Sequence, residues 1–165
     1  MGENSLVLGQ RLREGCGHGQ QLEEDIAQAN IALDLIGQAR NYLTYAGEVE
    51  GKGRDEAKLA YLRDAGEFRK LLLVEQPNGD FAHTIARQLY FDAWHHLLLQ
   101  ALSRSTDTRI AEIAAKGLKE VSYHLRRSRA WVIMLGDGTD ASPPRAPART
   151  DARRMDRRGK VRMDA

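Results

Sequence analysis

The sequence predicts an all-α helix bundle, and three observations support this prediction. Apolar residues recur at spacings of three and four over several long stretches, which is the period of an α-helix with one buried face. No stretch alternates apolar and polar residues with the period of two that a half-buried strand requires. The composition is 42% hydrophobic but only 6% aromatic, which favours a helical protein over a β-sandwich or barrel. We therefore expect one helical domain over residues 1–140.

The first long helix is predicted from about residue 21 to residue 45, after a short helix within residues 1–13. Its apolar stripe consists of Leu22, Ile26, Ala29, Leu33, Ile36 and Leu43. Asn30, Asp34 and Gln38 follow at every fourth position along the margin of this stripe. Such a row is either a solvated flank or one wall of a polar site inside the bundle. Gly47 is expected to end the helix.

A second long helix is predicted over residues 56–74. Its apolar residues are Leu59, Leu62, Phe68, Leu71, Leu72 and Leu73. It ends before Pro77, which cannot continue a helix, and before the Asn78-Gly79 pair, which is typical of a tight turn.

A third helix is predicted over residues 81–102, with Asp80 as its N-cap. It is apolar on much of its circumference, at Ile85, Leu89, Phe91, Trp94, Leu97, Leu98, Leu99 and Leu102. A helix with so wide an apolar surface is buried centrally or against a partner. The fourth helix is predicted over residues 109–134, followed by Gly136 and Gly138. Its seam comprises Ile110, Ala114, Gly117, Val121, His124, Ser128 and Trp131.

Charge divides the chain into two parts. Residues 141–165 hold seven arginines and one lysine against three aspartates, a charge of +5, which leaves −3 of the total +2 for residues 1–140. The tail has no Leu, Ile, Phe, Tyr or Trp and is predicted to be disordered. The basic balance therefore does not indicate a nucleic-acid-binding face on the folded part.

The compartment is predicted from cysteine usage and hydropathy. Cys16 is the single cysteine, so no internal disulfide can form and a reducing environment is expected. No apolar run is long enough to span a membrane, and the N-terminal residues lack the pattern of a signal peptide. We expect a cytoplasmic protein that binds neither a membrane nor nucleic acid.

A di-iron carboxylate bundle needs a Glu on two helices and a Glu-x-x-His pair on two others. Glu67 and Lys70 have this spacing, but lysine is a cation without a free lone pair and repels a metal ion. Asp92 and His95 also have the spacing, with Asp in place of Glu. Val121 lies three residues before His124, where a carboxylate would be required. We therefore expect no metal ion bound by this chain.

Two interpretations stay open for the positions that such a metal site would use, which are Asp34, Glu67, Lys70, Glu120 and His124. In the first, they form ordinary salt bridges and exposed faces. In the second, they form a polar cluster inside the bundle, where Lys70 supplies the positive charge that iron would otherwise supply, because buried charges need pairing.

Three stretches together carry a family resemblance: GQRLREGCGHGQQLEEDIAQANIALDLIGQARNYL, LLLVEQPNGDFAHTIARQLYFDAW and AAKGLKEVSYHLRRSRAWVIMLGDGTD. Over residues 5–140 the chain resembles the structural C subunits of the multicomponent phenylacetyl-CoA epoxidases. The resemblance implies a ferritin-like helix bundle that is catalytically silent. It implies that a homologous catalytic A subunit holds the di-iron centre, that the CoA thioester is handled by this partner, and that a reductase component delivers electrons.

The resemblance also implies where to look for contacts with the CoA ester. The first candidates for a contribution near that ligand are Glu67, Phe68, Arg69 and Lys70. In the competing interpretation these side chains are solvated or form salt bridges. The alternative to a non-catalytic subunit is that the chain is itself an enzyme, an atypical di-iron oxygenase-like protein.

The end of the chain departs from the family, whose members continue with helical sequence after the GDGT turn. The Arg/Pro/Ala-rich tail instead suggests a truncated or frameshifted reading frame, and hence an incomplete bundle that lacks its closing helix. A genuine short variant with a basic tail is the competing interpretation, and a non-functional truncated fragment is another outcome to be considered.

Overall fold

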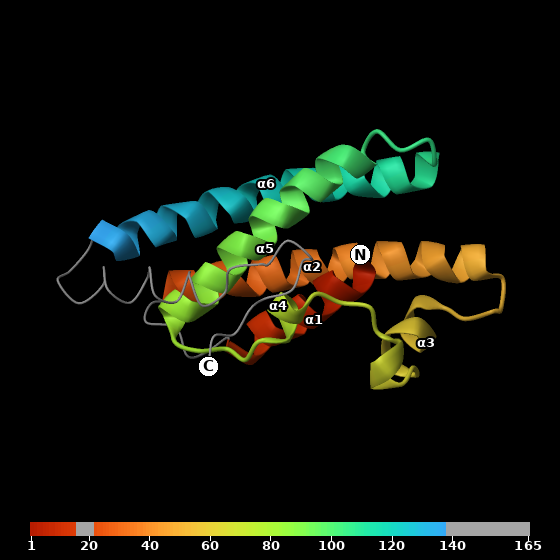
Figure 1. Ribbon diagram of the computed structural model, residues 1–165, viewed down its shortest axis with the longest axis horizontal. Helices are drawn as coiled ribbons and strands as arrows, with labels where there is room; N and C mark the ends of the chain where they lie inside the picture. The colour runs from red at the N-terminus through yellow and green to blue at the C-terminus, as the bar shows by residue number, and fades with distance from the viewer. Residues whose placement is uncertain (16–21, 138–165) are drawn as a thin grey trace.

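The computed structural model describes residues 1–15 and 22–137. Every regular element in these ranges is helical, which confirms the predicted all-α class (Figure 1). The elements are α1 (Gly2–Gly15), α2 (Leu22–Glu50), α3 (Glu56–Tyr61), the 3₁₀ turn η1 (Ala65–Glu67), α4 (Leu72–Glu75), α5 (Phe81–Leu102) and α6 (Thr108–Asp137). The predicted disorder of residues 141–165 and the predicted domain boundary at residue 140 lie outside the described residues.

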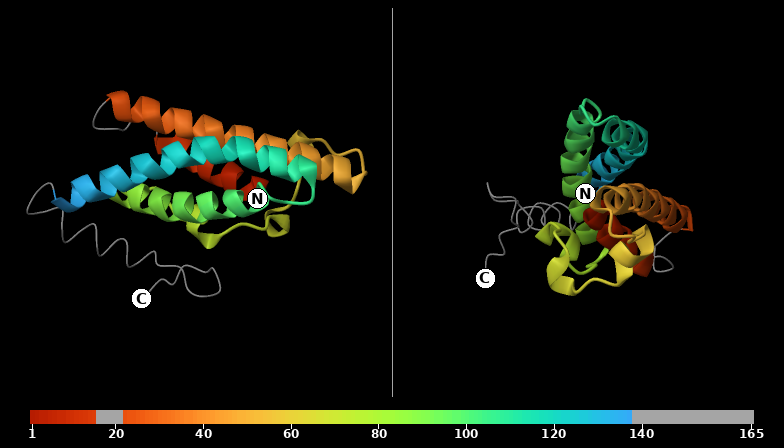
Figure 2. Two further views of the ribbon diagram at one scale, coloured as in Figure 1. Left: turned by 90° about the horizontal axis from the view of Figure 1, so that it is seen from above. Right: turned by 90° about the vertical axis from the view of Figure 1, so that its right-hand side faces the viewer.

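Two helix pairs build the bundle. α1 packs along α2, and α5 packs along α6 as a hairpin closed by the turn at residues 103–107. α6 also contacts α2, so that α2 lies between α1 and α6 (Figures 1 and 2). This arrangement is consistent with a ferritin-like bundle. None of the helices in the described ranges is long and apolar enough to cross a membrane.

The boundaries of α5 and α6 follow from local capping, and both helices agree with the prediction. The Asp80 side chain accepts a hydrogen bond from the backbone N–H of His83 at 2.9 Å, which satisfies one of the free donors of the first turn. Asp107 accepts in the same way from Ile110 at 3.1 Å before α6. The predicted seam of α6 is also confirmed, because Ala114, Val121 and several further members are buried.

The helix predicted over residues 56–74 is wrong. Asp55 caps the short α3 by accepting from the backbone of Lys58, but the chain then turns through η1 and becomes extended. Side chains of α1 supply the partners that a continuous helix would have supplied. The Glu3 carboxylate accepts from the backbone N–H of Arg69 at 2.7 Å, and Asn4 Oδ1 accepts from that of Leu71 at 2.8 Å.

The expected end of α2 at Gly47 is also wrong, because the helix continues to Glu50. The chain leaves it at Gly51, which adopts φ 68°, a left-handed conformation that glycine adopts without steric cost. Gly47 has a different role, since a Cβ at this position would overlap the carbonyl oxygen of Arg54 in the returning loop.

Most of the core lies on a different face of α2 from the predicted stripe, of which only Leu43 is buried. Leu22, Ile26 and Leu33 are 72%, 53% and 63% exposed. The buried apolar residues of α2 are Ile31, Ala32, Leu35, Ala39, Tyr42 and Leu43. These pack with apolar residues of α1 on one flank and with residues of α5 and α6 on the other. α3 also contacts α2, near its C-terminal half, whereas the face that carries Leu22, Ile26 and Leu33 is exposed.

Candidate functional site

A buried polar cluster lies where α2, α5 and α6 meet. It consists of Asp34 and Gln38 on α2, Gln88, Asp92 and His95 on α5, and Glu120, His124 and Ser128 on α6. Most of these side chains are almost fully buried, and His124 is 0% exposed. Buried polar groups cost free energy unless they are hydrogen-bonded, so the pairing within the cluster determines its chemistry.

Two contacts of the cluster join α6 to α2. His124 Nε2 lies 2.9 Å from Asp34 Oδ2, and Gln38 Nε2 donates to Glu120 Oε2 at 2.7 Å. Beside them, Arg127 forms an ion pair with Glu24, closer to the start of α2. A carboxylate can only accept, so Nε2 of a neutral His124 carries the proton and donates it to Asp34. The sequence-predicted residues Asp34, Glu120 and His124 are thus brought to one region.

Asp92 on α5 joins this helix to α6, because its carboxyl group accepts a hydrogen bond from Ser128 Oγ at 2.8 Å. It also accepts one from Gln88 Nε2, on α5 itself, at 2.7 Å. Burial raises the pKa of Asp92 to about 7, against the lowering effects of these two hydrogen bonds and of the Arg127 charge. Near neutral pH this carboxyl group is therefore divided between its protonated and ionised forms.

The two buried histidines are neutral at pH 7. Burial, together with smaller contributions from His124 and the N-terminal amino group, lowers the pKa of His95 to about 3. Burial also lowers the pKa of His124, against the opposing hydrogen bond to Asp34. The Nδ1 atom of each imidazole is buried without a hydrogen-bond partner in the described part of the chain.

The described residues do not fit a di-iron centre. Neutral imidazoles and carboxylates are the right ligand types, but Asp34, Asp92 and Glu120 each accept a hydrogen bond from a neighbouring side chain. Over residues 1–15 and 22–137, no group of three or more His, Cys, Asp or Glu side chains is placed to hold one metal ion. The cluster instead ties three helices together through pairwise contacts.

Glu67 and Lys70 lie away from this cluster, on the α1 side of α2. Glu67 closes a capping box with Asp64, and Lys70 forms an ion pair with Glu75 at 2.9 Å. The two residues do not share a helix face, because η1 ends between them. The positive charge that acts on Asp92 comes from Arg127, so the structure does not support the interpretation in which Lys70 replaces iron.

The neighbours of Lys70 are also engaged locally. Phe68 packs against the apolar cluster of Leu6, Ala39, Leu43 and Leu59. The guanidinium of Arg63 lies 4.4 Å from the centre of the Phe68 ring. The backbone of Arg69 is held by Glu3. Nothing in this arrangement tests the prediction that Glu67, Phe68, Arg69 and Lys70 lie near a CoA ester.

Sequence reasoning missed the contribution of α5 to the cluster. The metal-ligand spacing of Asp92 and His95 was recognised, but the two residues were not grouped with Asp34, Glu120 and His124. The buried face of this helix includes Arg87, Gln88, Asp92 and His95. Their successive spacings of one, four and three place them on one side of the helix, and this was the available signal.

A second buried polar contact explains part of the LLLVEQPNGDFAHTIARQ stretch. Arg87, 1% exposed, donates from Nη1 to the carbonyl of Gln76 at 2.8 Å and from Nη2 to Asn78 Oδ1 at 2.7 Å. The Asn78 amide donates in turn to the carbonyl of Arg11 on α1. The guanidinium therefore holds the turn between α4 and α5 and links it to α1.

Comparison of the sequence with known proteins identifies the family of the chain. Residues 1–152 match the model of the family described as "Phenylacetic acid catabolic protein". The chain is 58% identical over 142 residues to the C subunit of the 1,2-phenylacetyl-CoA epoxidase of Escherichia coli (strain K12). The match covers 86% of this chain and 57% of that relative, so the chain spans little more than half the relative's length. The chain belongs to the phenylacetic acid catabolic protein family.

Proposed function

We propose that this chain is a non-catalytic structural subunit of a phenylacetyl-CoA 1,2-epoxidase in aerobic phenylacetate catabolism. In this role it packs against a homologous catalytic A subunit that holds the di-iron centre and handles the CoA thioester. A reductase component supplies electrons to that partner, and this chain binds no cofactor. The complex works in the cytoplasm. The identity to the C subunit of the E. coli epoxidase supports the assignment.

One observation carries the structural role. The carboxylates of the buried polar cluster are each bonded to a side chain of a neighbouring turn or helix. Such pairing rigidifies a bundle interior and fixes the relative placement of α2, α5 and α6. A subunit that shapes its partner needs this fixed placement, whereas a di-iron catalyst needs the same residue types free to converge on metal ions.

The outer face of the C-terminal half of α6 is suited to an unlike partner. Tyr123, Ile133 and Met134 are 44%, 62% and 55% exposed there. Arg126 and Arg129 line a shallow cavity of about 380 Å³ with Ile133 and three further residues of this helix. On this α6 face the cavity combines apolar area with two cations, so it is complementary to an apolar surface with acidic residues.

Co-purification tests the proposal. The full chain is co-expressed with an epoxidase catalytic A subunit, and the complex is isolated through a tag on that subunit. We expect this chain in the complex, and we expect Ile133→Glu to reduce its yield at least about tenfold. Val49→Glu is the matched control, since Val49 is 68% exposed at the far end of α2.

Two results would contradict the proposal. The first is the absence of association at micromolar concentrations of both folded proteins. The second is two iron atoms bound per copy of this chain in the purified protein, which would assign the metal chemistry to this chain.

A further inference from the structure

One face of α2 has the pattern of a coiled-coil seam, and its residues Leu22, Ile26 and Leu33 are exposed in the described part of the chain. Leu22, Ile26, Ala29, Leu33, Ile36 and Arg40 follow one another at alternating spacings of four and three. This heptad pattern places six side chains along one line of the helix. The left view of Figure 2 shows α2 running along one edge of the molecule. We call the line of these six residues the α2 seam.

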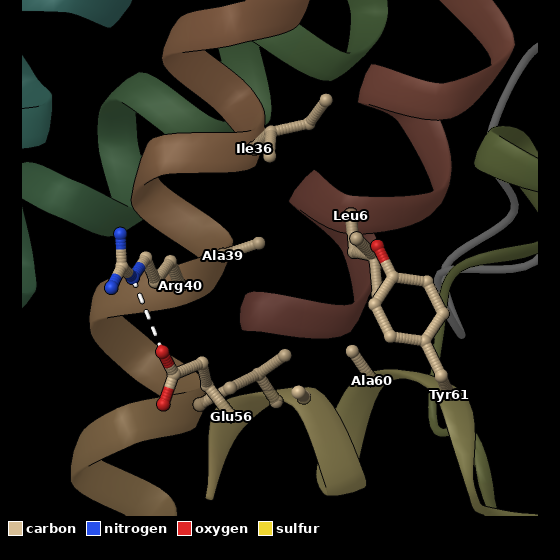
Figure 3. A pocket seen from close by; sticks show the side chains of 9 residues that line it. Leu6, Ile36, Ala39, Arg40, Glu56, Ala60 and Tyr61 are labelled. Atoms are coloured by element: carbon tan, nitrogen blue, oxygen red, sulfur yellow. Dashed lines mark hydrogen bonds and ion pairs between the residues drawn. The ribbon is translucent and has the colours of Figure 1, made fainter.

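The two ends of the α2 seam differ in shape. At the N-terminal end Leu22 and Ile26 project from the surface, 72% and 53% exposed. At the other end Ile36 and Arg40 border an apolar groove, which Figure 3 shows between α2, α1 and α3. The other residues that line the groove are Leu6, Ala39, Leu43, Glu56, Ala57, Ala60 and Tyr61.

The groove has room for a projecting aliphatic side chain. Its volume is about 190 Å³. An apolar cavity of about 150 Å³ accepts a benzene molecule, so a leucine side chain fits into this groove. Leu6, Ala39 and Ala60 supply apolar walls, and the Arg40–Glu56 ion pair at 3.2 Å closes one side (Figure 3). One end of the α2 seam thus offers knobs and the other end offers a hole.

The ends also differ in charge. The first turn of α2 carries Glu23, Glu24 and Asp25. Glu24 is committed to Arg127, whereas Glu23 is exposed. Toward the other end, the Arg40 side chain is 74% exposed. The seam therefore has an acidic end with projecting residues and, at the end with the groove, an exposed cation, Arg40, that also pairs with Glu56.

We propose that the α2 seam pairs antiparallel with the α2 seam of a second copy of this chain. Leu22 of one copy enters the groove beside Arg40 of the other, with Glu23 close to that guanidinium. Ile26 then faces Ile36, and the small Ala29 faces the large Leu33. The two-fold axis makes each contact occur twice, and residues 22 and 40 lie about 27 Å apart along the helix axis.

The second copy is favoured over an unlike protein because the α2 seam is complementary to itself. Its projecting residues lie at one end and its border of the groove lies at the other, with Glu23 and Arg40 beside them, in the order that an antiparallel pair requires. The α6 face differs, since the cavity on it is lined by the cations Arg126 and Arg129 and by no acidic residue. Pairing through one helix of each copy buries less than the ~1,200 Å² of a standard stable interface, so we expect dissociation in the micromolar range.

Sedimentation velocity across the micromolar concentration range tests the pairing on the full chain. We expect a concentration-dependent dimer, and we expect Leu33→Glu to abolish it. Leu97→Glu is the matched control, because Leu97 is 67% exposed on α5, outside the seam. Far-UV circular dichroism establishes that each variant keeps its helices. A monomer at every concentration, or a dimer that persists in a folded Leu33→Glu variant, would overturn the proposal.

Charge reversal tests the register. Arg40→Glu places like charges together at both symmetric contacts and should weaken the dimer at least about tenfold. Adding Glu23→Lys to Arg40→Glu should restore the dimer. Such a restoration would show that Arg40→Glu does not act only by breaking the Arg40–Glu56 ion pair within one copy. An Arg40→Glu dimer of unchanged affinity, or a double variant that stays monomeric, would contradict the antiparallel contact.

Cross-linking tests the orientation in a Cys16→Ser background. Ala29→Cys combined with Leu33→Cys should give a disulfide-linked dimer on mild oxidation, whereas Leu22→Cys alone should not. Efficient cross-linking of Leu22→Cys would indicate a parallel pair and refute the proposal. If the wild-type chain is monomeric and Leu33→Glu loses its catalytic partner instead, the seam belongs to an unlike protein and the proposed dimer is wrong.

Discussion

His124 Nε2 lies 2.9 Å from Asp34 Oδ2, and this contact joins the buried centre of α6 to the side of α2. The His124 side chain is fully buried, whereas that of Asp34 is 39% exposed. The carboxylate thus connects an interior imidazole to the solvent boundary. It also fixes the histidine tautomer, because Nε2 must carry the proton that it donates.

Replacing Asp34 with alanine should destabilise the bundle by about 1–2 kcal/mol. The change leaves the His124 donor without its acceptor in the interior. Water can reach the vacated position in part, because Asp34 is partly exposed, and this keeps the cost near the lower end of the usual range. Urea unfolding followed by circular dichroism measures the difference.

Asp34→Asn is the control for this substitution, since its amide oxygen can still accept the His124 proton. We expect it to retain most of the stability of the wild-type chain. Equal stability of Asp34→Ala and wild type would show that the contact contributes nothing to the fold.

The pH dependence of stability should reveal two opposing groups in the cluster. The pKa of Asp92 is raised to about 7 in the folded chain, so its effect destabilises the fold progressively as pH rises from about 4 to 7. The pKa of His95 is lowered to about 3, so its effect destabilises the fold as pH falls below about 6.5. Between about pH 4 and 6.5 the two effects offset each other.

Asp92→Asn should expose the histidine effect. As pH falls from about 6.5 to about 4.5, the variant should lose more stability than wild type. The buried His95 still resists protonation, whereas the opposing effect of Asp92 has been removed. At about pH 8 it should be at least as stable, since a buried charge has been removed. Urea unfolding at these pH values measures both differences, and identical pH profiles would contradict the raised pKa of Asp92.

Two glycines of α2 should respond in opposite directions to alanine. A Cβ at Gly47 would overlap the backbone of Arg54, whereas a Cβ at Gly37 would meet nothing within 4 Å. We expect Gly47→Ala to destabilise by about 1–3 kcal/mol through displacement of the loop after α2. Gly37→Ala should stabilise by up to about 1 kcal/mol through helix propensity. Thermal unfolding of both variants measures the contrast, and a stabilised Gly47→Ala would refute the close approach.

The sequence pattern correctly predicted the helices whose boundaries and buried faces are determined by nearby residues. Asp80 supplies the cap that starts α5, and the apolar spacing of α6 identifies its buried side. Over residues 56–74 the leucines suggested one helix, but the decisive partners were Glu3 and Asn4, far away in the chain. Periodicity along one segment carries no information about such tertiary hydrogen bonds.

The face of α2 was misassigned for a related reason. The heptad through Leu22, Ile26 and Leu33 is a regular apolar line, yet these residues are exposed. α1 and α6 instead cover its two flanks, where Gln28 and Gln38 are buried and hydrogen-bonded. The pattern identified a helix surface that favours packing, but it could not show whether the packing occurs within this chain.

Arg87 should be the residue on which the turn between α4 and α5 most depends. Its guanidinium satisfies the carbonyl of Gln76 and the amide oxygen of Asn78, so Arg87→Met leaves both acceptors without this donor in a buried site. We expect a loss of about 3 kcal/mol, since hydrogen bonds from a charged donor contribute more than neutral ones. Urea unfolding measures this loss.

The effect of Arg87→Met should also be local, which separates it from general destabilisation. Amide hydrogen exchange should accelerate first in residues 76–80 and in the part of α1 that receives the Asn78 bond, while the α5–α6 hairpin keeps its protection. Arg104→Met is the matched control, because Arg104 is exposed in the turn before α6. Uniform acceleration across all helices would contradict this, since it would mean that Arg87 contributes to the whole core rather than to the turn.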